Sequence, residues 1–598
     1  MKALMSGAAV AALVLGVSAT AAGAQTYNRL VVFGDSLSDN GNLYLASGGT
    51  TPASPPYWQG RFSNGPVFTE MLGFNAANFM GPVTGSINMA FGGARTDVEA
   101  MPPGMPVQLN QYRSRGGTFG AGDLVTVLGG ANNLFQGIQA AGASPNPTAN
   151  FGAVAKATAS DVNGLVGQIS GLGAGTVLVV NLPSLSMTPQ FAGTPGAALA
   201  DYGASTFNST LRAQLAATAA ANPNTNIIQA DIFDAGKLVA ADPAAFGLKN
   251  VKDACFNGVT VCSNPDEYFY FDGVHPTSKG HSILAVLAND YLYYGTQGSQ
   301  IAVLGESAWR HRQDDLEIAT TALSVREGWS EGTRIGVEAL VDTLSVDARG
   351  AIGKTKADGY GVRIALETAT PDWRFGLAGT FRRSDVKAGA IKGDVDSYAM
   401  DAYGGWRSEP MFVNMALGLA QNTYRDITRQ TPFATAVHRS STSGTSFGAR
   451  LQGGTWMGQG DWKFSPRAAL AWVSTEVDAF NEAGPLADYS YQGRHLKALT
   501  GELSVRTEYE ASGYRFYAEG GWRDNISDNS DATRTGLVGN TAKVLSQDVD
   551  LPFGSQGLVN LGLEGQVGSR VLVQVGYRGR FGSKFDSHMG GLTFTLPL

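Results

Sequence analysis

The sequence has little charge and no basic stripe. Only 16% of its 598 residues are charged, against about 25% in an ordinary soluble protein. The net charge is −7, and the isoelectric point lies near 5.5. A chain of negative charge without a basic patch or a recognisable motif lacks the electrostatic footprint that nucleic acid requires. We therefore exclude nucleic acid as a partner.

Long apolar runs are also missing. Beyond the N-terminus no stretch of 18 apolar residues occurs, so the sequence predicts no membrane-spanning helix, and any membrane attachment must use another device. The N-terminus itself has one Lys, a short apolar run and then Ala22-Gly23-Ala24, the small-residue pattern of a signal peptidase site. We predict a signal peptide over residues 1–24 and export of the rest. An N-terminal anchor helix is the alternative, and the shortness of the apolar core disfavours it.

Cysteine is nearly absent. Cys255 and Cys262 are the only two in the sequence, and both fall in the part predicted to be exported. Oxidising conditions outside the cytoplasm allow a disulfide that closes this short loop. A metal site is the alternative, but two thiols without nearby histidines do not make a zinc site. The sequence therefore favours a structural disulfide.

The charge that is present is unevenly distributed. Residues 1–300 hold 12 Lys and Arg and 16 Asp and Glu, whereas residues 301–598 hold 31 and 34. A chain of this length is also too long for one ordinary core. We expect at least two domains in different surroundings.

The first half alternates short apolar runs with helical stretches. Four β-branched runs end in turn residues and resemble buried strands, and helical segments such as 151–171 and 205–221 lie between them. The runs are residues 30–36, 123–130, 176–183 and 225–231. This order predicts a parallel sheet covered on both faces, with active residues at the carboxyl ends of its strands.

The second half has a period of two. In residues 497–509, for example, Leu503 and Val505 alternate with Glu502 and Arg506. About a dozen such segments follow a helical, charged stretch near 301–327, and many carry aromatic residues near their ends. Strands that are apolar on one face and polar on the other are typical of a transmembrane barrel. A soluble β-sandwich also alternates, but charged residues on the second face of strand after strand favour the barrel.

Catalytic residues can be proposed from the first half alone. Ser36 follows the first apolar run in the segment FGDSLSD, where a Gly-Asp turn would expose its hydroxyl. Only two histidines occur before residue 300. His275 lies in FDGVHP, three residues after Asp272, a spacing that lets the carboxylate orient the imidazole. His281 falls inside the following helix and is more simply a packed or solvated helix residue. We predict Ser36 as nucleophile, His275 as base and Asp272 as its orienting acid.

Two further segments could donate hydrogen bonds to an oxyanion. NMAFGGART offers Gly92 and Gly93, where the missing side chain lets a backbone N–H approach a substrate, and we choose Gly93. GGANNLF places Asn132 after a predicted strand, with an amide that can complete the hole. Each segment alone would be an ordinary turn.

Taken together, these segments resemble the four successive blocks of the GDSL, or SGNH, hydrolase family. GDSLS, NMAFGGA, GANN and DGVHP occur in the family's order, between about Arg29 and Tyr293. The resemblance implies a flavodoxin-like α/β/α fold and a Ser-His-Asp esterase whose oxyanion hole uses the N–H groups of Ser36 and Gly93 and the Asn132 side chain. It implies no metal or other cofactor. One departure is Asn133, where the family's third block commonly has Asp.

The second half extends the resemblance. A GDSL domain followed by a linking helix and a 12-stranded antiparallel transmembrane barrel resembles the autotransporter esterases of Gram-negative bacteria, in which the helix threads the barrel. The final segment LTFTLPL is similar to the C-terminal strand of outer-membrane barrels, although Pro597 and a terminal Leu depart from the usual aromatic end. We expect a signal peptide (1–24), an esterase domain (25–294), a linker with the threading helix (295–330) and a barrel (331–598).

The resemblance also implies where the protein acts and with what. We expect an outer-membrane protein with its catalytic domain at the cell surface. Its expected partners are an acyl ester or lipid substrate, outer-membrane lipid, periplasmic chaperones and the barrel-insertion machinery, and we expect a monomer. Four alternatives stay open at this point. The enzyme could be a phospholipase or a carbohydrate acetylesterase, the domain could be an inactive surface adhesin, or the barrel could be a secretion pore from which the domain is cleaved.

Overall fold

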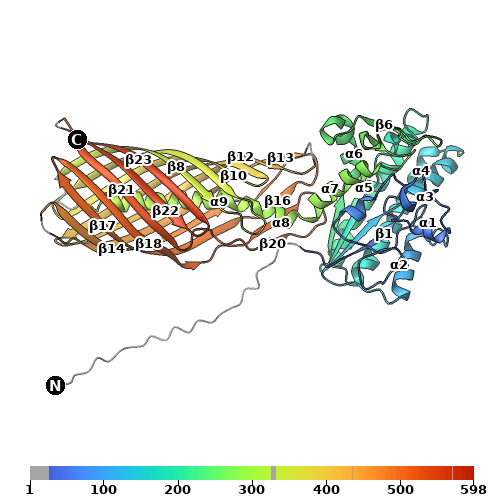
Figure 1. Ribbon diagram of the computed structural model, residues 1–598, viewed down its shortest axis with the longest axis horizontal. Coiled ribbons are helices and arrows are strands. Elements are labelled where there is room, and N and C mark those ends of the chain that lie inside the picture. Colours follow the sequence, from blue (N-terminus) through green and yellow to red (C-terminus); the bar gives the residue numbers. More distant parts are fainter. Residues whose placement is uncertain (1–25, 325–330, 434–435, 459, 569) are drawn as a thin grey trace, which may run out of the picture.

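The computed structural model describes residues 26–324, 331–433, 436–458, 460–568 and 570–598. Within these residues, a helix–strand domain stands at one end of a closed β-barrel, and a helix runs from the domain into the barrel (Figure 1). The predicted signal peptide lies outside the described residues. In the part of the chain that is described, no helix combines the length and the apolar character needed to cross a membrane.

The N-terminal domain is built on a parallel sheet with the strand order β2-β1-β3-β4-β5. Almost every residue of these strands is buried, because helices cover both faces of a parallel sheet. The strands are β1 (Arg29–Gly34), β2 (Ile87–Asn88), β3 (Asp123–Leu128), β4 (Thr176–Val180) and β5 (Asn226–Ala230). All four strands predicted from apolar runs are therefore present, and the short edge strand β2 is an addition.

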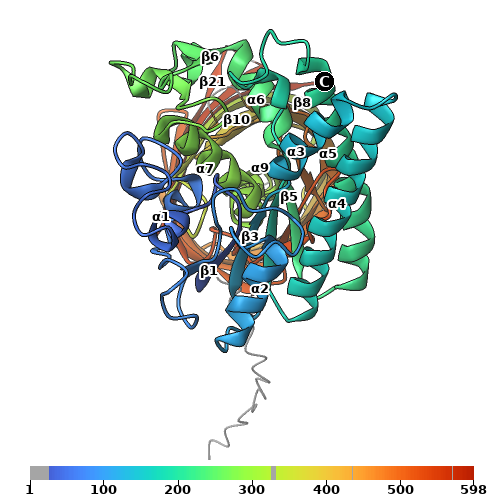
Figure 2. The same cartoon turned by 90° about the vertical axis from the view of Figure 1, so that its right-hand side faces the viewer.

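Helices pack on the two faces of this sheet and form two separate cores (Figure 2). One core contains α2 (Met105–Ser114), α3 (Ala131–Gly142), α4 (Pro147–Gly171) and α5 (Ala197–Ala221). The other contains α6 (Ile232–Ala241) and α7 (Ser278–Leu292). Short elements complete the domain: α1 (Asn42–Ala46), β6 (Asn250–Ala254) and β7 (Tyr268–Tyr270). The α/β/α architecture predicted from the sequence is confirmed.

The C-terminal domain is a closed antiparallel barrel of twelve strands, closed by pairing of the last strand with the first. Its strands are β8 (Gly332–Val346), β9 (Thr355–Ala369), β10 (Trp373–Ala388), β11 (Ile391–Ser408), β12 (Met411–Gln430), β13 (Val437–Thr455), β14 (Trp462–Val477), β17 (Arg494–Ala511), β18 (Tyr514–Asp528), β21 (Gln556–Val567), β22 (Val571–Gly582) and β23 (Phe585–Pro597). As predicted, Leu503 and Val505 face outward while Glu502 and Arg506 are buried inside. The alternation therefore does mark the two faces of the barrel wall.

A helix fills part of the barrel lumen. Helix α9 (Ala302–Ala322) follows the short helix α8 (Tyr294–Gly298) and ends five residues before the predicted end at 327. Every residue from Ala302 to Thr320 is buried, charged ones included. Buried charges need partners, and the barrel wall provides them: Glu317 is ion-paired with Arg523 and Arg580. A helix this polar can be enclosed because the lumen is polar as well.

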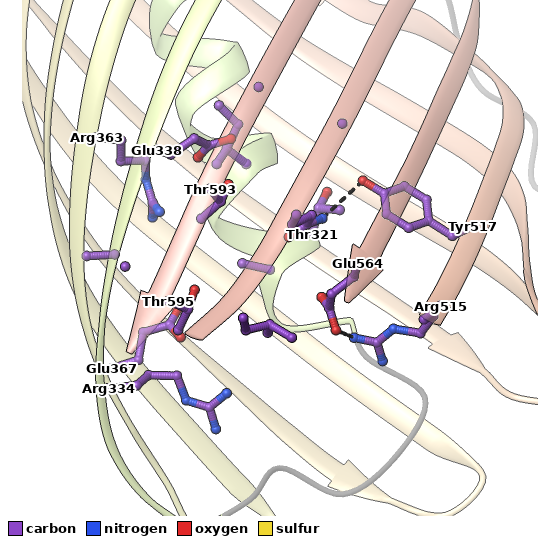
Figure 3. A pocket seen from close by; sticks show the side chains of 18 of the residues that line it. Thr321, Arg334, Glu338, Arg363, Glu367, Arg515, Tyr517, Glu564, Thr593 and Thr595 are labelled. Carbon is purple, nitrogen blue, oxygen red and sulfur yellow. Dashed lines mark hydrogen bonds and ion pairs between the residues drawn. The ribbon is translucent and has the colours of Figure 1, made fainter. Parts of the chain in front are cut away.

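Beyond the end of α9 the lumen widens into a cavity of about 310 Å³ (Figure 3). Thr321 of the last helical turn and strand residues such as Arg363 and Glu338 line it. On the opposite wall, Arg515 is ion-paired with Glu564, and Gln574 donates to the Tyr517 hydroxyl at 3.2 Å. This end of the barrel thus has the polar interior that a transmembrane barrel demands.

Two long barrel loops build a small sheet between the barrel and the catalytic domain. The loop after β14 contributes β15 (Phe480–Asn481) and β16 (Tyr489–Tyr491), and the loop after β18 contributes β19 (Thr533–Leu537) and β20 (Leu545–Gln547). The two domains are therefore joined by more than the chain segment that links them.

Candidate active site

The turn after β1 carries Ser36. Its position is fixed by a close approach of two backbones, because a Cβ on Gly34 would lie 2.4 Å from the Leu128 carbonyl oxygen of β3. The buried side chain of Gln108 closes the strand end from the other side, accepting from the Gly34 N–H at 3.0 Å and donating to its carbonyl at 2.8 Å. Ser36 itself is 8% exposed. The strand end holds the serine rigidly while its hydroxyl faces the loops around it.

Ser36, His275 and Asp272 form one hydrogen-bonded chain. The Ser36 Oγ lies 2.9 Å from His275 Nε2, and His275 Nδ1 lies 2.7 Å from Asp272 Oδ2. Asp272 also accepts the backbone N–H groups of Val274 and His275, at 2.9 and 2.8 Å, which folds the segment DGVH into a tight turn. The structure thus brings Ser36 to a pair of residues that lie more than 230 positions later in the chain. Such a chain can remove the proton of a serine that attacks a carbonyl.

The environment of Asp272 keeps its carboxylate ionised. Burial alone would raise its pKa, but the charge of His275 and the hydrogen bonds it receives lower the pKa to about 2. One of these bonds comes from the Tyr57 hydroxyl at 2.7 Å. Tyr57 was not identified from the sequence, because it lies 215 positions away and in no recognised motif. The Tyr57 hydroxyl holds Asp272 Oδ2, the carboxylate oxygen nearest to His275 Nδ1, in the orientation that His275 requires.

An aromatic ring supports the histidine. The ring of Phe62 packs on the His275 imidazole with 5.1 Å between the ring centroids. The same ring lies so close to Gly92 that a Cβ there would be 2.1 Å from it. The space at position 92 therefore accepts only glycine.

Asp39 connects the Ser36 loop with the glycine loop. Its buried carboxylate accepts the N–H of Gly92 at 2.7 Å and the N–H of Gly41 at 2.8 Å. Burial raises the pKa of Asp39 to about 6, although these backbone hydrogen bonds act in the opposite direction. Burial likewise raises the pKa of Asp35 to about 6. Asp39 was not predicted as a site residue from the sequence, although it lies only three residues after Ser36.

The sequence predicts N–H donors for an oxyanion at Ser36, Gly93 and Asn132. The Gly92 N–H is already donated to Asp39, whereas none of the hydrogen bonds described for the chain uses the N–H of Gly93 or Ser36. Gly93 has a φ of +76°, a conformation that favours glycine. The Asn132 side-chain amide donates one hydrogen to the Ala94 carbonyl at 2.9 Å, and an amide NH₂ carries a second hydrogen that can also be donated. An oxyanion hole requires donors of this kind, aimed at one point beside the nucleophile.

The remaining residues singled out from the sequence have structural surroundings. Asn133 accepts the Thr96 N–H at 3.0 Å through its side-chain oxygen, so an amide suffices to hold this loop. His281 is fully buried, accepts the Phe68 N–H at 3.3 Å, and burial lowers its pKa to about 3. Cys255 and Cys262 are joined by a disulfide. These residues shape the domain and lie outside the hydrogen-bonded chain at Ser36.

Fold and site together define a class: an α/β ester hydrolase carried on a membrane barrel. The family model "GDSL-like Lipase/Acylhydrolase" matches residues 30–287, and the model "Autotransporter beta-domain" matches residues 335–578. The chain belongs to the GDSL-like lipase/acylhydrolase family and carries an autotransporter beta-domain. It is a carboxylic ester hydrolase, with an outer-membrane β-barrel and an exported passenger domain.

Individual relatives cover either the whole chain or one part of it. Esterase EstA from Pseudomonas aeruginosa is 27% identical over 607 residues, which covers 88% of this chain and 89% of that protein. A phosphatidylcholine-sterol acyltransferase from Aeromonas hydrophila is 31% identical over 39% of this chain and 67% of its own length. Among solved structures, the translocator domain of autotransporter NalP from Neisseria meningitidis covers 51% of this chain and 99% of its own, with 15% identity and a TM-score of 0.42.

Proposed function

We propose that the chain is a cell-surface serine carboxylesterase that hydrolyses acyl esters through Ser36, His275 and Asp272. The observation that carries the proposal is the continuous chain of short hydrogen bonds from the Ser36 hydroxyl through His275 to Asp272. His275 takes the proton of Ser36 as the hydroxyl attacks the ester carbonyl, and ionised Asp272 stabilises the imidazolium that forms. His275 then returns that proton to the departing alcohol.

The oxyanion and the second half of the reaction follow from the same residues. The negative oxygen of the tetrahedral intermediate accepts hydrogen bonds from the N–H groups of Ser36 and Gly93 and from the Asn132 amide. Water enters after the alcohol has left, and His275 removes its proton as it attacks the acyl-serine. The acid leaves and Ser36 regains its proton, so the cycle consumes only ester and water.

The test is the replacement Ser36→Ala in the full-length protein. We expect hydrolysis of p-nitrophenyl butyrate to fall at least about a thousandfold, with an unchanged amount of protein in the outer membrane. A fluorophosphonate probe should label the wild-type chain and leave the variant unlabelled. Turnover that persists in the variant would remove Ser36 from the mechanism. A wild-type chain that neither turns over esters nor reacts with the probe would instead support an inactive adhesin.

Barrel geometry supports display at the cell surface. Transmembrane barrels have short periplasmic turns and longer extracellular loops. The long loops 478–493 and 529–555 lie at the end that bears the catalytic domain, whereas the turns at the other end, such as 409–410 and 512–513, are short. We propose the domain division 25–294, 295–330 and 331–598, with the first segment outside the cell after removal of residues 1–24.

A phospholipid is the second candidate substrate. The Aeromonas relative is named for phosphatidylcholine and a sterol, and its similarity covers 39% of this chain. Release of fatty acid from phosphatidylcholine vesicles, compared with p-nitrophenyl butyrate at equal enzyme, separates the two substrate classes. A phospholipase releases fatty acid at a comparable rate, whereas a carboxylesterase leaves the vesicles intact.

A further inference from the structure

The catalytic domain and the barrel share one hydrophobic cluster. Residues of α6 and α7 pack together with Phe433, Leu486, Tyr489 and Leu537, which all come from barrel loops. We call the loops after β12, β14 and β18 the docking loops, since each contacts the catalytic domain. Interfaces that contain a common buried core hold their partners in one orientation. The catalytic domain is therefore docked on the barrel as well as tethered to it.

Two docking loops contact the part of the catalytic domain that lies nearest the barrel. Asn540 exchanges hydrogen bonds with the backbone of Gln229 on the edge strand β5, donating at 2.8 Å and accepting at 3.2 Å. The Tyr489 hydroxyl donates to the Asp290 carbonyl at 3.0 Å, at the end of α7. Arg429 lies over the Tyr489 ring at 3.5 Å and fixes that ring from the barrel side. These contacts set the position of the domain as a whole.

The third docking loop reaches deeper, towards the catalytic residues. Phe433 is 1% exposed and packs edge-on against the ring of Phe246, with 4.9 Å between the centroids. It also forms one wall of a small apolar cavity of about 40 Å³. The same cavity is also lined by Leu37, which follows Ser36, and by Val274 and Pro276, which flank His275. One barrel side chain thus packs into the space behind the catalytic loops.

We infer that Phe433 is a positioning residue for the active site, so that the esterase reaches its full rate only when the domain is docked on its barrel. The inference rests on the proposed function of Ser36 and His275. The segments that carry these residues pack against the cavity from one side, and the cavity leaves little space for movement. Removing the Phe433 ring would enlarge it, and a partly relaxed cavity lets its walls shift. A shift of about 1 Å at the reacting groups can cost a hundredfold in rate.

The experiment compares three variants of the full-length chain in detergent: Phe433→Ala, Phe433→Leu and Asn540→Ala. Asn540→Ala is the matched control, because it removes a docking contact that does not touch the cavity. For p-nitrophenyl butyrate, we expect Phe433→Ala to lower kcat about tenfold with KM within twofold of wild type. Phe433→Leu refills most of the space and should recover most of kcat. Asn540→Ala should keep the wild-type kcat.

Several outcomes overturn the inference. A wild-type kcat in Phe433→Ala shows that the ring does not position the site. An equal loss of kcat in Phe433→Ala and Asn540→Ala shows that any weakening of the interface between domain and barrel lowers kcat. The Phe433 ring then has no specific role. A changed preference for acyl-chain length, with kcat for butyrate retained, makes the cavity a substrate pocket instead. If Phe433→Ala fails to fold, Phe433→Val takes its place, because it leaves more of the space empty than Phe433→Leu does. We then expect a lower kcat in Phe433→Val than in Phe433→Leu at unchanged KM, and equal kcat in the two variants overturns the inference. Failure of the proposed function is separate, since the wild-type chain would then show no turnover.

Discussion

At the scale of single residues, the active site depends on carboxylates with different surroundings. Asp272 receives hydrogen bonds from His275, two backbone N–H groups and Tyr57, and its pKa falls to about 2. Asp39 is buried more completely, and the pKa of its carboxyl group rises to about 6 although it accepts the Gly92 N–H. Asp272 therefore stays charged at every pH at which the enzyme could work. Asp39 takes up a proton as the pH falls through about 6.

This difference predicts a steep loss of activity in acid. As the pH falls through about 6, protonation of Asp39 weakens its hold on the loop that carries Gly92 and Gly93. We expect this extra protonation to make the fall of log kcat/KM in acid steeper in the wild type than in Asp39→Asn. In Asp39→Asn the activity at pH 8 should also be lower, because an amide N–H₂ then faces backbone donors. Initial rates of the wild type and Asp39→Asn between pH 4 and 8 measure the activity at pH 8 and the slope in acid. Identical slopes for the two proteins would contradict the role of Asp39.

The residues that could be predicted from the sequence are those that lie in short motifs. Ser36, Asp272 and His275 could be chosen because each follows a strand or turn signal and few histidines compete. Tyr57 and Phe62 could not, because they reach the site from a loop without periodicity, and only the folded chain places them beside Asp272 and His275. Gly93 was chosen over Gly92 from its place in the motif, and nothing in the sequence indicated that the Gly92 N–H is donated to Asp39.

At the scale of elements, the regular repeat of apolar residues along the chain determined which strands and helices could be predicted. Buried strands and alternating barrel strands were found because their apolar residues repeat regularly. Strand β21 was not predicted, because Gly557, Gly562 and Gly565 interrupt the alternation of apolar and polar residues along it. The end of α9 was placed too late, because the charges that mark this helix continue beyond Ala322. Contacts between the docking loops and the catalytic domain have no sequence signal, as they depend on how two domains meet.

Helix α9 is held in the lumen by buried ion pairs, and one of its residues can test this. Glu317 is paired with both Arg523 and Arg580. Replacing it with Gln leaves the buried guanidinium of Arg580 without an anion and removes one of the two carboxylate partners of Arg523, which keeps Glu502. Breaking a buried ion pair in this way costs about 3–5 kcal/mol. We expect Glu317→Gln to unfold at a lower temperature in detergent, measured by the heat-induced mobility shift on gels. The exposed replacement Glu409→Gln is the control. Equal transition temperatures for wild type and Glu317→Gln would contradict the role of the pair.

At the scale of the whole molecule, the barrel, the helix and the catalytic domain form one continuous assembly. The tether enters the barrel through α8 and α9, and the docking loops contact the domain from the same side (Figure 1). The catalytic site therefore has a fixed relation to the membrane. An interface of this kind favours retention of the domain over its release.

Surface display predicts a difference in labelling between the two ends of the molecule. Ala157 lies on the exposed side of α4 in the catalytic domain, and Asp461 lies in an exposed turn at the far end of the barrel. In intact cells, a membrane-impermeant maleimide should label Ala157→Cys and leave Asp461→Cys unlabelled. After cell lysis both should react. Labelling of Asp461→Cys alone in intact cells would reverse the proposed orientation.

The enclosed helix also has a consequence for the cell that carries the protein. A twelve-stranded barrel with an empty lumen would be an open path for small polar solutes across the outer membrane. Here the chain's own segment from Ala302 to Thr320 occupies that path with side chains buried against the wall. The helix therefore leaves such solutes much less of the lumen than an empty barrel would.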